Sequence, residues 1–203
     1  MSGRPWVRDP ARLDDPGNWA GGFYELDIEL GPVDPVRLQQ DLSGLWSAAR
    51  VEGCHAHGGE WPAVPLTVGE LAARGHLAGV VLVPSGERVV CGVVGIDYGD
   101  GGQWLSFHVP LGALGRVEHR VGGFPFDGRS GVASLQWRRP IDGWLAGVAG
   151  AVHREVGIAC ALIGFEVDAG VDAASLGGGV PAQRWETILL PGPGGLVAHP
   201  ANQ

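Results

Sequence analysis

Three apolar segments in series decide the fold of this chain: "HLAGVVLVP" (76–84), "ERVVCGVVGIDY" (87–98) and "QWLSFHVPL" (103–111). Each is rich in β-branched and aromatic residues, which favour strands. The linkers between them contain "SG" and "GDGG", spellings that are typical of tight turns between antiparallel strands. The sequence therefore predicts a three-strand meander. Two of its strands are apolar almost throughout, and we expect those to be central and covered on both faces.

Another strand is predicted upstream, at "FYELDIEL" (23–30), because apolar and acidic residues alternate there with a period of two. Its apolar residues point one way, and the acidic residues Glu25, Asp27 and Glu29 point the other. This pattern is typical of a half-buried strand.

Two main helices and one short helix are expected around these strands. Asp34 caps the first main helix, Pro35 occupies its first turn, and Gly53 is the expected stop. Thr67 has the spacing to Glu70 of a capping box, which predicts the short helix over 67–75.

The second main helix is expected over 140–156, with its proline in the first turn, and strands are predicted over 158–168 and 184–190. Strands in series, with helices between the blocks, indicate an α+β fold. We expect a mainly antiparallel sheet, formed by the three-strand meander and flanking strands, with the two main helices packed on one face.

The chain has 203 residues, which suits one domain. Residues 1–22 are rich in Pro, Asp, Arg and Gly and predict a flexible N-terminal arm. Residues 23–190 form the expected single α+β domain, and residues 191–203 form a Pro/Gly-rich C-terminal tail.

Composition narrows the class of protein. All 14 basic residues are arginine, a bias typical of a GC-rich bacterial genome, so lysine chemistry is excluded. The formal charge of −8 argues against nucleic acid as a partner, because nucleic-acid binding needs a basic face. We expect neither a membrane span nor a signal peptide, because no apolar run is long enough for a membrane and the first 15 residues contain no apolar segment. Three cysteines without regular spacing suit a reducing, cytoplasmic location.

The segment "CHAHGGE" (54–60) contains several residue types that bind metals, although their spacing is not that of a known metal motif. It is expected in a loop after the first helix. Its side chains with zinc-ligand chemistry are Cys54, His55, His57 and Glu60. Adjacent ligands converge poorly on one tetrahedral ion, so a zinc site would need help from elsewhere, such as His76, His108, Asp97 or Glu166. The alternatives are a surface loop with incidental histidines and a nucleophilic Cys54.

The acidic row Glu25, Asp27 and Glu29 has three interpretations. It stays in water, it meets a basic partner, or it supplies a catalytic or metal-binding carboxylate. Acidic surfaces steer basic partner proteins toward their site, so the row is a candidate partner surface.

A third candidate region is aromatic. Trp104 lies in a predicted strand, and Phe124 and Phe126 lie in the glycine-rich segment "GGFPFDG", which is either a pocket lid or a loop tucked against the core. His108 shares a strand face with Trp104 and Ser106. His108 and His57 are therefore the candidate acid–base residues.

Two function classes follow. The leading hypothesis is a non-enzymatic binding protein, for example of the immunity or antitoxin type, with an acidic surface for a basic protein partner. The alternative is a small metal-dependent or acid–base enzyme that acts on a small molecule. The sequence leaves open whether the chain is an enzyme and whether it forms a homo-oligomer.

Overall fold

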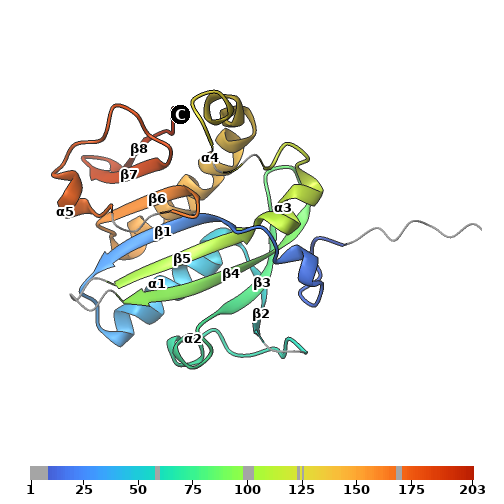
Figure 1. The fold of residues 1–203 in the computed structure, drawn as a ribbon. Helices are drawn as coiled ribbons and strands as arrows, with labels where there is room; N and C mark the ends of the chain where they lie inside the picture. The colour runs from blue at the N-terminus through green and yellow to red at the C-terminus, as the bar shows by residue number, and fades with distance from the viewer. Residues whose placement is uncertain (1–8, 58–59, 98–102, 123, 125, 168–170) are drawn as a thin grey trace, which may run out of the picture.

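The computed structural model confirms the α+β prediction (Figure 1). It describes residues 9–57, 60–97, 103–122, 124, 126–167 and 171–203, and over these ranges eight strands form one sheet. The strands, in chain order, are β1 (Phe23–Gly31), β2 (Glu52–Ala56), β3 (Leu77–Leu82), β4 (Arg88–Asp97), β5 (Gln103–Pro110), β6 (Cys160–Phe165), β7 (Thr187–Gly192) and β8 (Gly195–His199).

The strands run in the order β2-β3-β4-β5-β1-β6-β7-β8, and every neighbouring pair is antiparallel. The meander β3-β4-β5 is confirmed. Its second predicted turn, "GDGG", falls outside the described residues. The first strand in the sequence, β1, lies between β5 and β6, so it brings the two halves of the chain together.

The helical segments lie before, between and after the strands. They are η1 (Pro16–Asn18), α1 (Pro35–Ala49), α2 (Val68–Arg74), α3 (Leu111–Val117), α4 (Ser130–Val156) and α5 (Ala173–Leu176). As predicted, Asp34 caps α1 by accepting a hydrogen bond from the Arg37 amide, and Thr67 caps α2 by accepting one from the Glu70 amide. Of the described helices, none combines the length and the apolar character needed to cross a membrane.

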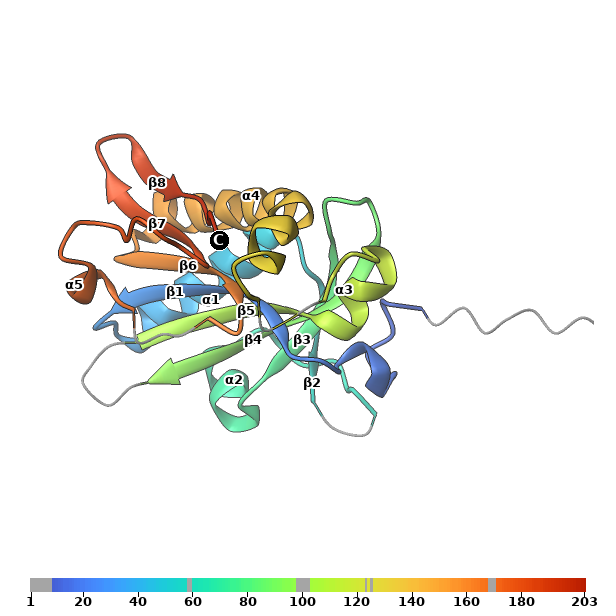
Figure 2. The ribbon, with the colours of Figure 1, turned by 45° about the horizontal axis from the view of Figure 1, so that its top comes forward.

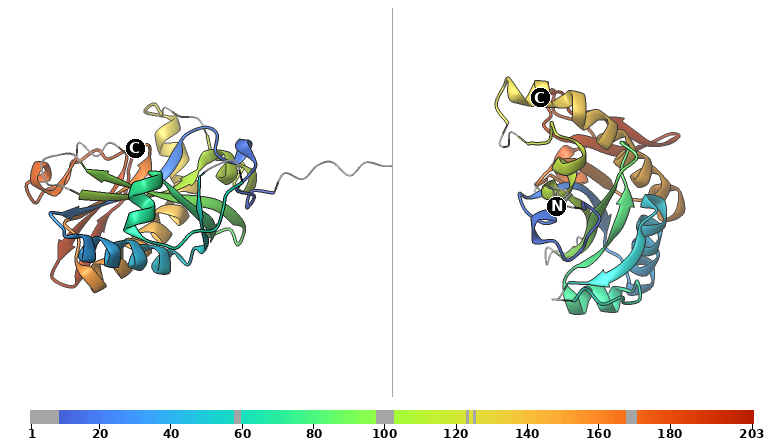
Figure 3. Two further views of the ribbon diagram at one scale, coloured as in Figure 1. Left: turned by 90° about the horizontal axis from the view of Figure 1, so that it is seen from below. Right: turned by 90° about the vertical axis from the view of Figure 1, so that its right-hand side faces the viewer.

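The two long helices, α1 and α4, lie side by side on one face of the sheet, as the view from below shows (Figure 3, left). The apolar side of β1 faces them, and Tyr24, Leu26 and Ile28 are fully buried there. The alternation predicted for β1 is therefore confirmed, and its acidic residues lie on the opposite face.

The helix α4 begins ten residues earlier than expected, and Pro140 lies inside it rather than in its first turn. Asp127 starts the helix by accepting hydrogen bonds from the Arg129 and Ser130 amides. An internal proline costs a helical hydrogen bond. The helix continues through it because the extra turns bury residues such as Leu135 and Trp137.

Residues 51–62 do not form the expected loop throughout, because Glu52–Ala56 pairs with β3 as the edge strand β2. The first helix also ends before Gly53, at Arg50, which adopts the left-handed conformation. Without β2 the edge of β3 would be unpaired, and this tertiary gain overrides the weak local signal.

The predicted C-terminal tail is likewise part of the sheet. β7 and β8 form a hairpin, and the amides of Asn202 and Gln203 donate to the Arg184 carbonyl. The glycines and prolines that suggested a tail supply its turn, where Gly195 has a φ of 124°.

The second face of the sheet is covered at its two ends. α3 and η1 lie together at one end, and α5 lies at the other (Figures 1 and 2). The end that carries α5 packs on a smaller apolar cluster that consists of Trp104, Cys160, Leu162 and Ile188.

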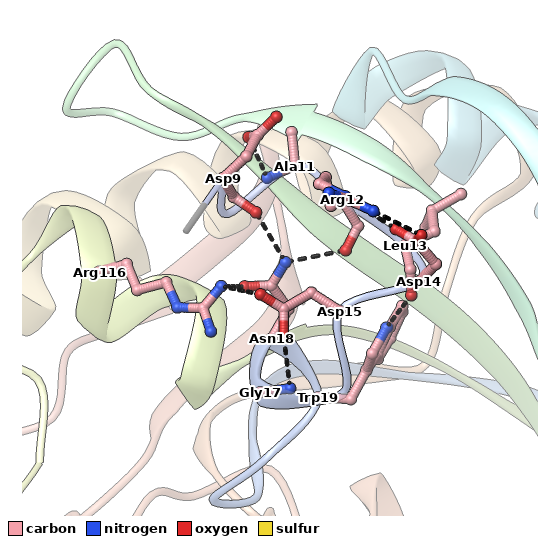
Figure 4. A network of polar contacts seen from close by, with 10 residues as sticks. All are labelled: Asp9, Ala11, Arg12, Leu13, Asp14, Asp15, Gly17, Asn18, Trp19 and Arg116. Atoms are coloured by element: carbon pink, nitrogen blue, oxygen red, sulfur yellow. Dashed lines mark hydrogen bonds and ion pairs between the residues drawn. The ribbon is translucent and has the colours of Figure 1, made fainter. Parts of the chain in front are cut away.

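The flexible arm predicted for residues 1–22 is wrong for residues 9–22, which fold against the sheet. Asn18 is fully buried, and its Nδ2 donates to the carbonyls of Asp9 (2.9 Å) and Arg12 (2.8 Å) (Figure 4). Arg116 of α3 donates to Asn18 Oδ1 and, at 2.9 Å, to Asp15 Oδ2. These polar bonds hold a segment whose composition predicts disorder.

We expect Asn18→Ala to lower the free energy of unfolding by about 1–3 kcal/mol, because it leaves buried carbonyls and the Arg116 guanidinium without their partner. The exposed Arg12→Ala on the same segment serves as the control and should change stability by less than about 0.5 kcal/mol. Urea unfolding followed by tryptophan fluorescence measures both. Equal effects of the two variants would contradict a fixed N-terminal segment.

Candidate functional site

The candidate site lies on the second face of the sheet, between its two covers. A pocket of ≈ 280 Å³ opens there, and its lining consists of Trp19, Phe23, Glu25, His57, His76, Val94 and His108. We call it the histidine pocket. Sheet pairing builds it: Glu25 on β1 is the register partner of His108 on β5, which is in turn the partner of Gly92 on β4.

Two imidazoles meet at the floor of this pocket. His76 Nε2 lies 3.2 Å from His108 Nε2, and the two rings are nearly parallel, with centroids 5.1 Å apart. They meet above Gly92, where an added Cβ would lie 2.0 Å from His76 Nε2 and 2.6 Å from His108 Nε2. Glycine at this position therefore makes the encounter of the two rings possible.

Aromatic rings form the rim. Trp19 stacks on Trp61 with centroids 5.1 Å apart and meets His76 edge-on at 5.4 Å. His57 is exposed and lies edge-on to Trp61 at 4.9 Å. Trp19 reaches this position because the N-terminal segment is folded, so a segment predicted as an arm supplies part of the site.

Burial keeps the pocket histidines neutral. It lowers the pKa of His76 to about 4, with a further contribution from His57, and the pKa of His108 to about 3, with a further contribution from His76. At neutral pH both imidazoles are therefore uncharged, each with one N–H and one lone pair, and these two rings bring no positive charge to the pocket floor.

The carboxylates on this face shift the other way. Burial raises the pKa of Glu25 to about 7, and the charge of Asp27 adds to the shift. Burial also raises the pKa of Asp27 to about 6. The Ser106 side chain partly offsets this shift, because it lowers the pKa of Asp27. However, neither Asp27 Oδ1 nor Ser106 Oγ has a hydrogen bond of normal geometry among the described residues.

The acidic row does not form the open surface that a basic partner would need. Asp27 is only 3 % exposed. Glu25 Oε2 accepts from the Val167 amide (2.9 Å) and Glu29 Oε2 from the Ala173 amide (2.8 Å), so described residues after β6 lie against both ends of the row. The sequence could not show this cover, because it comes from a region more than 130 residues away.

The four predicted zinc ligands do not converge. Cys54 packs against the main core, and His55 bonds through Nδ1 to the Trp61 carbonyl at 3.0 Å. Of these four, His57 alone lines the histidine pocket, and Glu60 is exposed outside it. Within the described ranges, no group of three or more His, Cys, Asp or Glu side chains is arranged to hold a metal ion.

The predicted aromatic pocket also comes apart. Trp104 is buried in the smaller apolar cluster. Phe124 stacks on Phe165 with centroids 3.7 Å apart and contacts Phe126 at 4.3 Å. Neither phenylalanine is among the described residues that line the histidine pocket, and both rings pack against the main core instead.

The two candidate acid–base residues, His108 and His57, do line the same pocket. Sequence reasoning named His76 only as a possible helper and did not place Trp19 or Phe23 at the site. The outward positions on β1 and β5 were the available signal, because they put Glu25 and His108 on one face. The register that joins them was not readable from the sequence.

The buried cysteines behave as core residues. Cys91 and Cys160 are fully buried, and burial raises the pKa of the Cys160 thiol to about 12. Burial raises the pKa of the Cys54 thiol as well. A thiol with a raised pKa is a poor nucleophile at neutral pH, so Cys54 does not support cysteine catalysis.

Comparisons with known proteins add no relative to this description. No protein-family model matches the chain, and neither the curated proteins nor the solved structures give a match. The arrangement of the pocket residues is therefore the basis for any functional inference.

Proposed function

We propose that the chain binds a small molecule in the histidine pocket, where imidazole and carboxylate groups serve as acid–base groups toward it. One observation carries the proposal: three histidines and Glu25, from four separate segments, line one pocket with aromatic walls. Convergent titratable groups in a concave, largely apolar site are the usual features of a small-molecule site.

The partner-binding hypothesis has less support. Its physical basis was a solvated acidic row, and that row is largely covered by the segment after β6. Of the three acids, only Glu25 lines the histidine pocket, and a half-buried carboxylate there favours a function inside the pocket over the steering of a basic protein.

Chemical labelling tests whether the pocket admits small molecules. Diethyl pyrocarbonate modifies neutral imidazole nitrogens, and mass spectrometry locates the label. His119, whose side chain is 92 % exposed, serves as the reference. We expect His76 and His108 to be modified at rates comparable with that of His119, although His108 is only 4 % exposed.

A core histidine without access would react only as the protein unfolds. An unlabelled His108 after complete modification of His119 would therefore contradict the proposal. Circular dichroism, recorded in parallel, checks that the labelled protein is still folded.

Solvent deuterium then distinguishes an enzyme from a binding protein. Small carbonyl compounds, including pyruvate, acetone and dihydroxyacetone, are incubated with the protein in heavy water and followed by proton NMR. Deuterium incorporation that disappears in His108→Asn supports acid–base chemistry. No incorporation across the panel favours binding alone.

A further inference from the structure

The facing nitrogens of His76 and His108 point to a function beyond proton transfer. In a histidine pair that merely shares a hydrogen bond, one Nε2 carries a proton and the other accepts it. The same approach also suits two lone pairs directed at one metal ion. Zinc–nitrogen bonds of 2.0–2.1 Å at a tetrahedral angle place two ligand nitrogens about 3.3 Å apart. The observed separation is 3.2 Å.

We propose that His76 and His108 bind a divalent transition-metal ion of the zinc type through their Nε2 atoms. The inference rests on the proposed function, because the ion would enter through the same open pocket. Imidazole nitrogens select zinc, cobalt, nickel or copper over magnesium or calcium, which prefer oxygen ligands.

The surroundings of the pair suit a ligand role. The backbone of Ser106 favours the protonated His108 ring, so it lies close enough to help orient the imidazole while Nε2 faces His76. The two histidines come from different elements, one just before β3 and one on β5, so the sheet fixes their separation.

Further ligands come from the pocket and the solvent. The exposed His57 ring lies 6.3 Å from the His76 ring, centroid to centroid. It lines the same pocket as Glu25. The two fixed protein ligands leave the remaining coordination positions to water, to the nearby His57 or to a small molecule that enters the pocket.

The test uses the full-length, untagged chain. After equilibrium dialysis against micromolar zinc, elemental mass spectrometry measures the metal retained. We expect about one zinc ion per chain, as for a single tetrahedral site. His76→Asn and His108→Asn should each weaken binding at least about tenfold, since even an outer partner of a metal ligand contributes that much.

His119→Asn is the matched control, because it removes an exposed histidine outside the pocket, and it should retain the metal. His57→Asn should weaken binding less than the other two pocket variants. Cobalt absorption adds a second readout, since tetrahedral coordination gives strong visible bands that the wild-type chain should show and His108→Asn should lack.

Retention of zinc by both His76→Asn and His108→Asn would overturn the inference, as would no retention by the wild-type chain. If a variant fails to fold, the test uses the wild-type protein instead and asks whether zinc protects its histidines from labelling. Zinc should then block diethyl pyrocarbonate labelling of His76 and His108 but not of His119, and equal labelling with and without zinc would count against the site.

The two proposals fail separately. A chain that is labelled at His108 but retains no zinc keeps the small-molecule pocket and loses the metal. A chain that is unlabelled at His108 loses the pocket.

Discussion

Replacing Arg138 by alanine is expected to lower the free energy of unfolding by about 3–5 kcal/mol, the loss typical of a broken buried charge network. Arg138 is a residue of α4, is only 1 % exposed, and reaches from the helix to the C-terminal part of the chain. Its guanidinium donates to the Gln203 carbonyl at 3.0 Å and to the Trp185 carbonyl, and at 3.3 Å to Tyr24 Oη.

The network continues to a buried acid. Tyr24 Oη donates to Asp142 Oδ1 at 2.5 Å, and Thr187 Oγ1 donates to Asp142 Oδ2 at 2.8 Å. Burial raises the pKa of Asp142, while Tyr24, Thr187 and Arg138 lower it. Without Arg138, the buried Asp142 loses its compensating charge, and the carbonyls of Trp185 and Gln203 lose this donor.

The neighbouring residue provides the control. Arg139 is exposed, and Arg139→Ala should change stability by less than about 0.5 kcal/mol. Guanidinium unfolding, followed by circular dichroism, measures both variants. Hydrogen exchange should show the largest loss of protection in β7 and β8. A loss below about 1 kcal/mol in Arg138→Ala would mean that the network is not a main source of stability.

Asp27→Asn is expected to stabilise the protein at neutral pH by about 2–3 kcal/mol, with the gain confined to pH values above the unfolded pKa. The pKa of Asp27 is raised to about 6 by burial, above its value of about 3.9 in an unfolded chain. The folded state therefore binds the proton more tightly, and the ionised form is unfavourable there.

The sign follows from this order of pKa values. Below about pH 4 the carboxyl is protonated in both states and costs nothing. As the pH rises from about 4 to 6, the unfolded state ionises first and wild-type stability falls. Asparagine has no proton to lose, so the difference between variant and wild type should grow through this window and then level off.

Other groups on this face titrate in both proteins. Glu25 shifts in the same direction as Asp27, whereas the pocket histidines shift oppositely, so only the difference between the two proteins isolates Asp27. Removal of the Asp27 charge also relieves Glu25, which adds to the gain. Urea unfolding between pH 4 and pH 8 measures it.

Glu29→Gln is the control for this series. It removes a carboxylate from the same side of β1, but this carboxylate accepts a hydrogen bond from the Ala173 amide. Its replacement should be neutral or destabilising, because a charge-assisted hydrogen bond is lost. If Glu29→Gln stabilised the protein as much as Asp27→Asn does, the cause would be the change in net charge rather than the burial of Asp27.

Local patterns determined several elements correctly. Asp34 and Thr67 cap their helices as predicted, because capping depends on neighbours within three residues. The alternation in 23–30 separated the buried side of β1 from its acidic side, because strand geometry fixes that separation. The meander followed from short turns between apolar segments.

Patterns of composition failed where distant contacts decide. The composition of residues 9–22 and 191–203 predicted an arm and a tail. However, Asn18 and Ala201 are buried, Asn18 with a hydrogen bond from Arg116 of α3 and Ala201 with one to Thr187 of β7. Pro140 read as a helix start, but the packing of the preceding turns carries α4 through it.

The sequence by itself determined which residues of β5 share a face, and so it named His108 as an acid–base candidate, while the segment 54–60 supplied His57. Only the tertiary structure decided that His76 meets His108 above Gly92, and that the acidic row is covered. The physical reason is register. Strand periodicity fixes the face on which a side chain lies, whereas its neighbours on that face depend on pairings between strands that are distant in the chain.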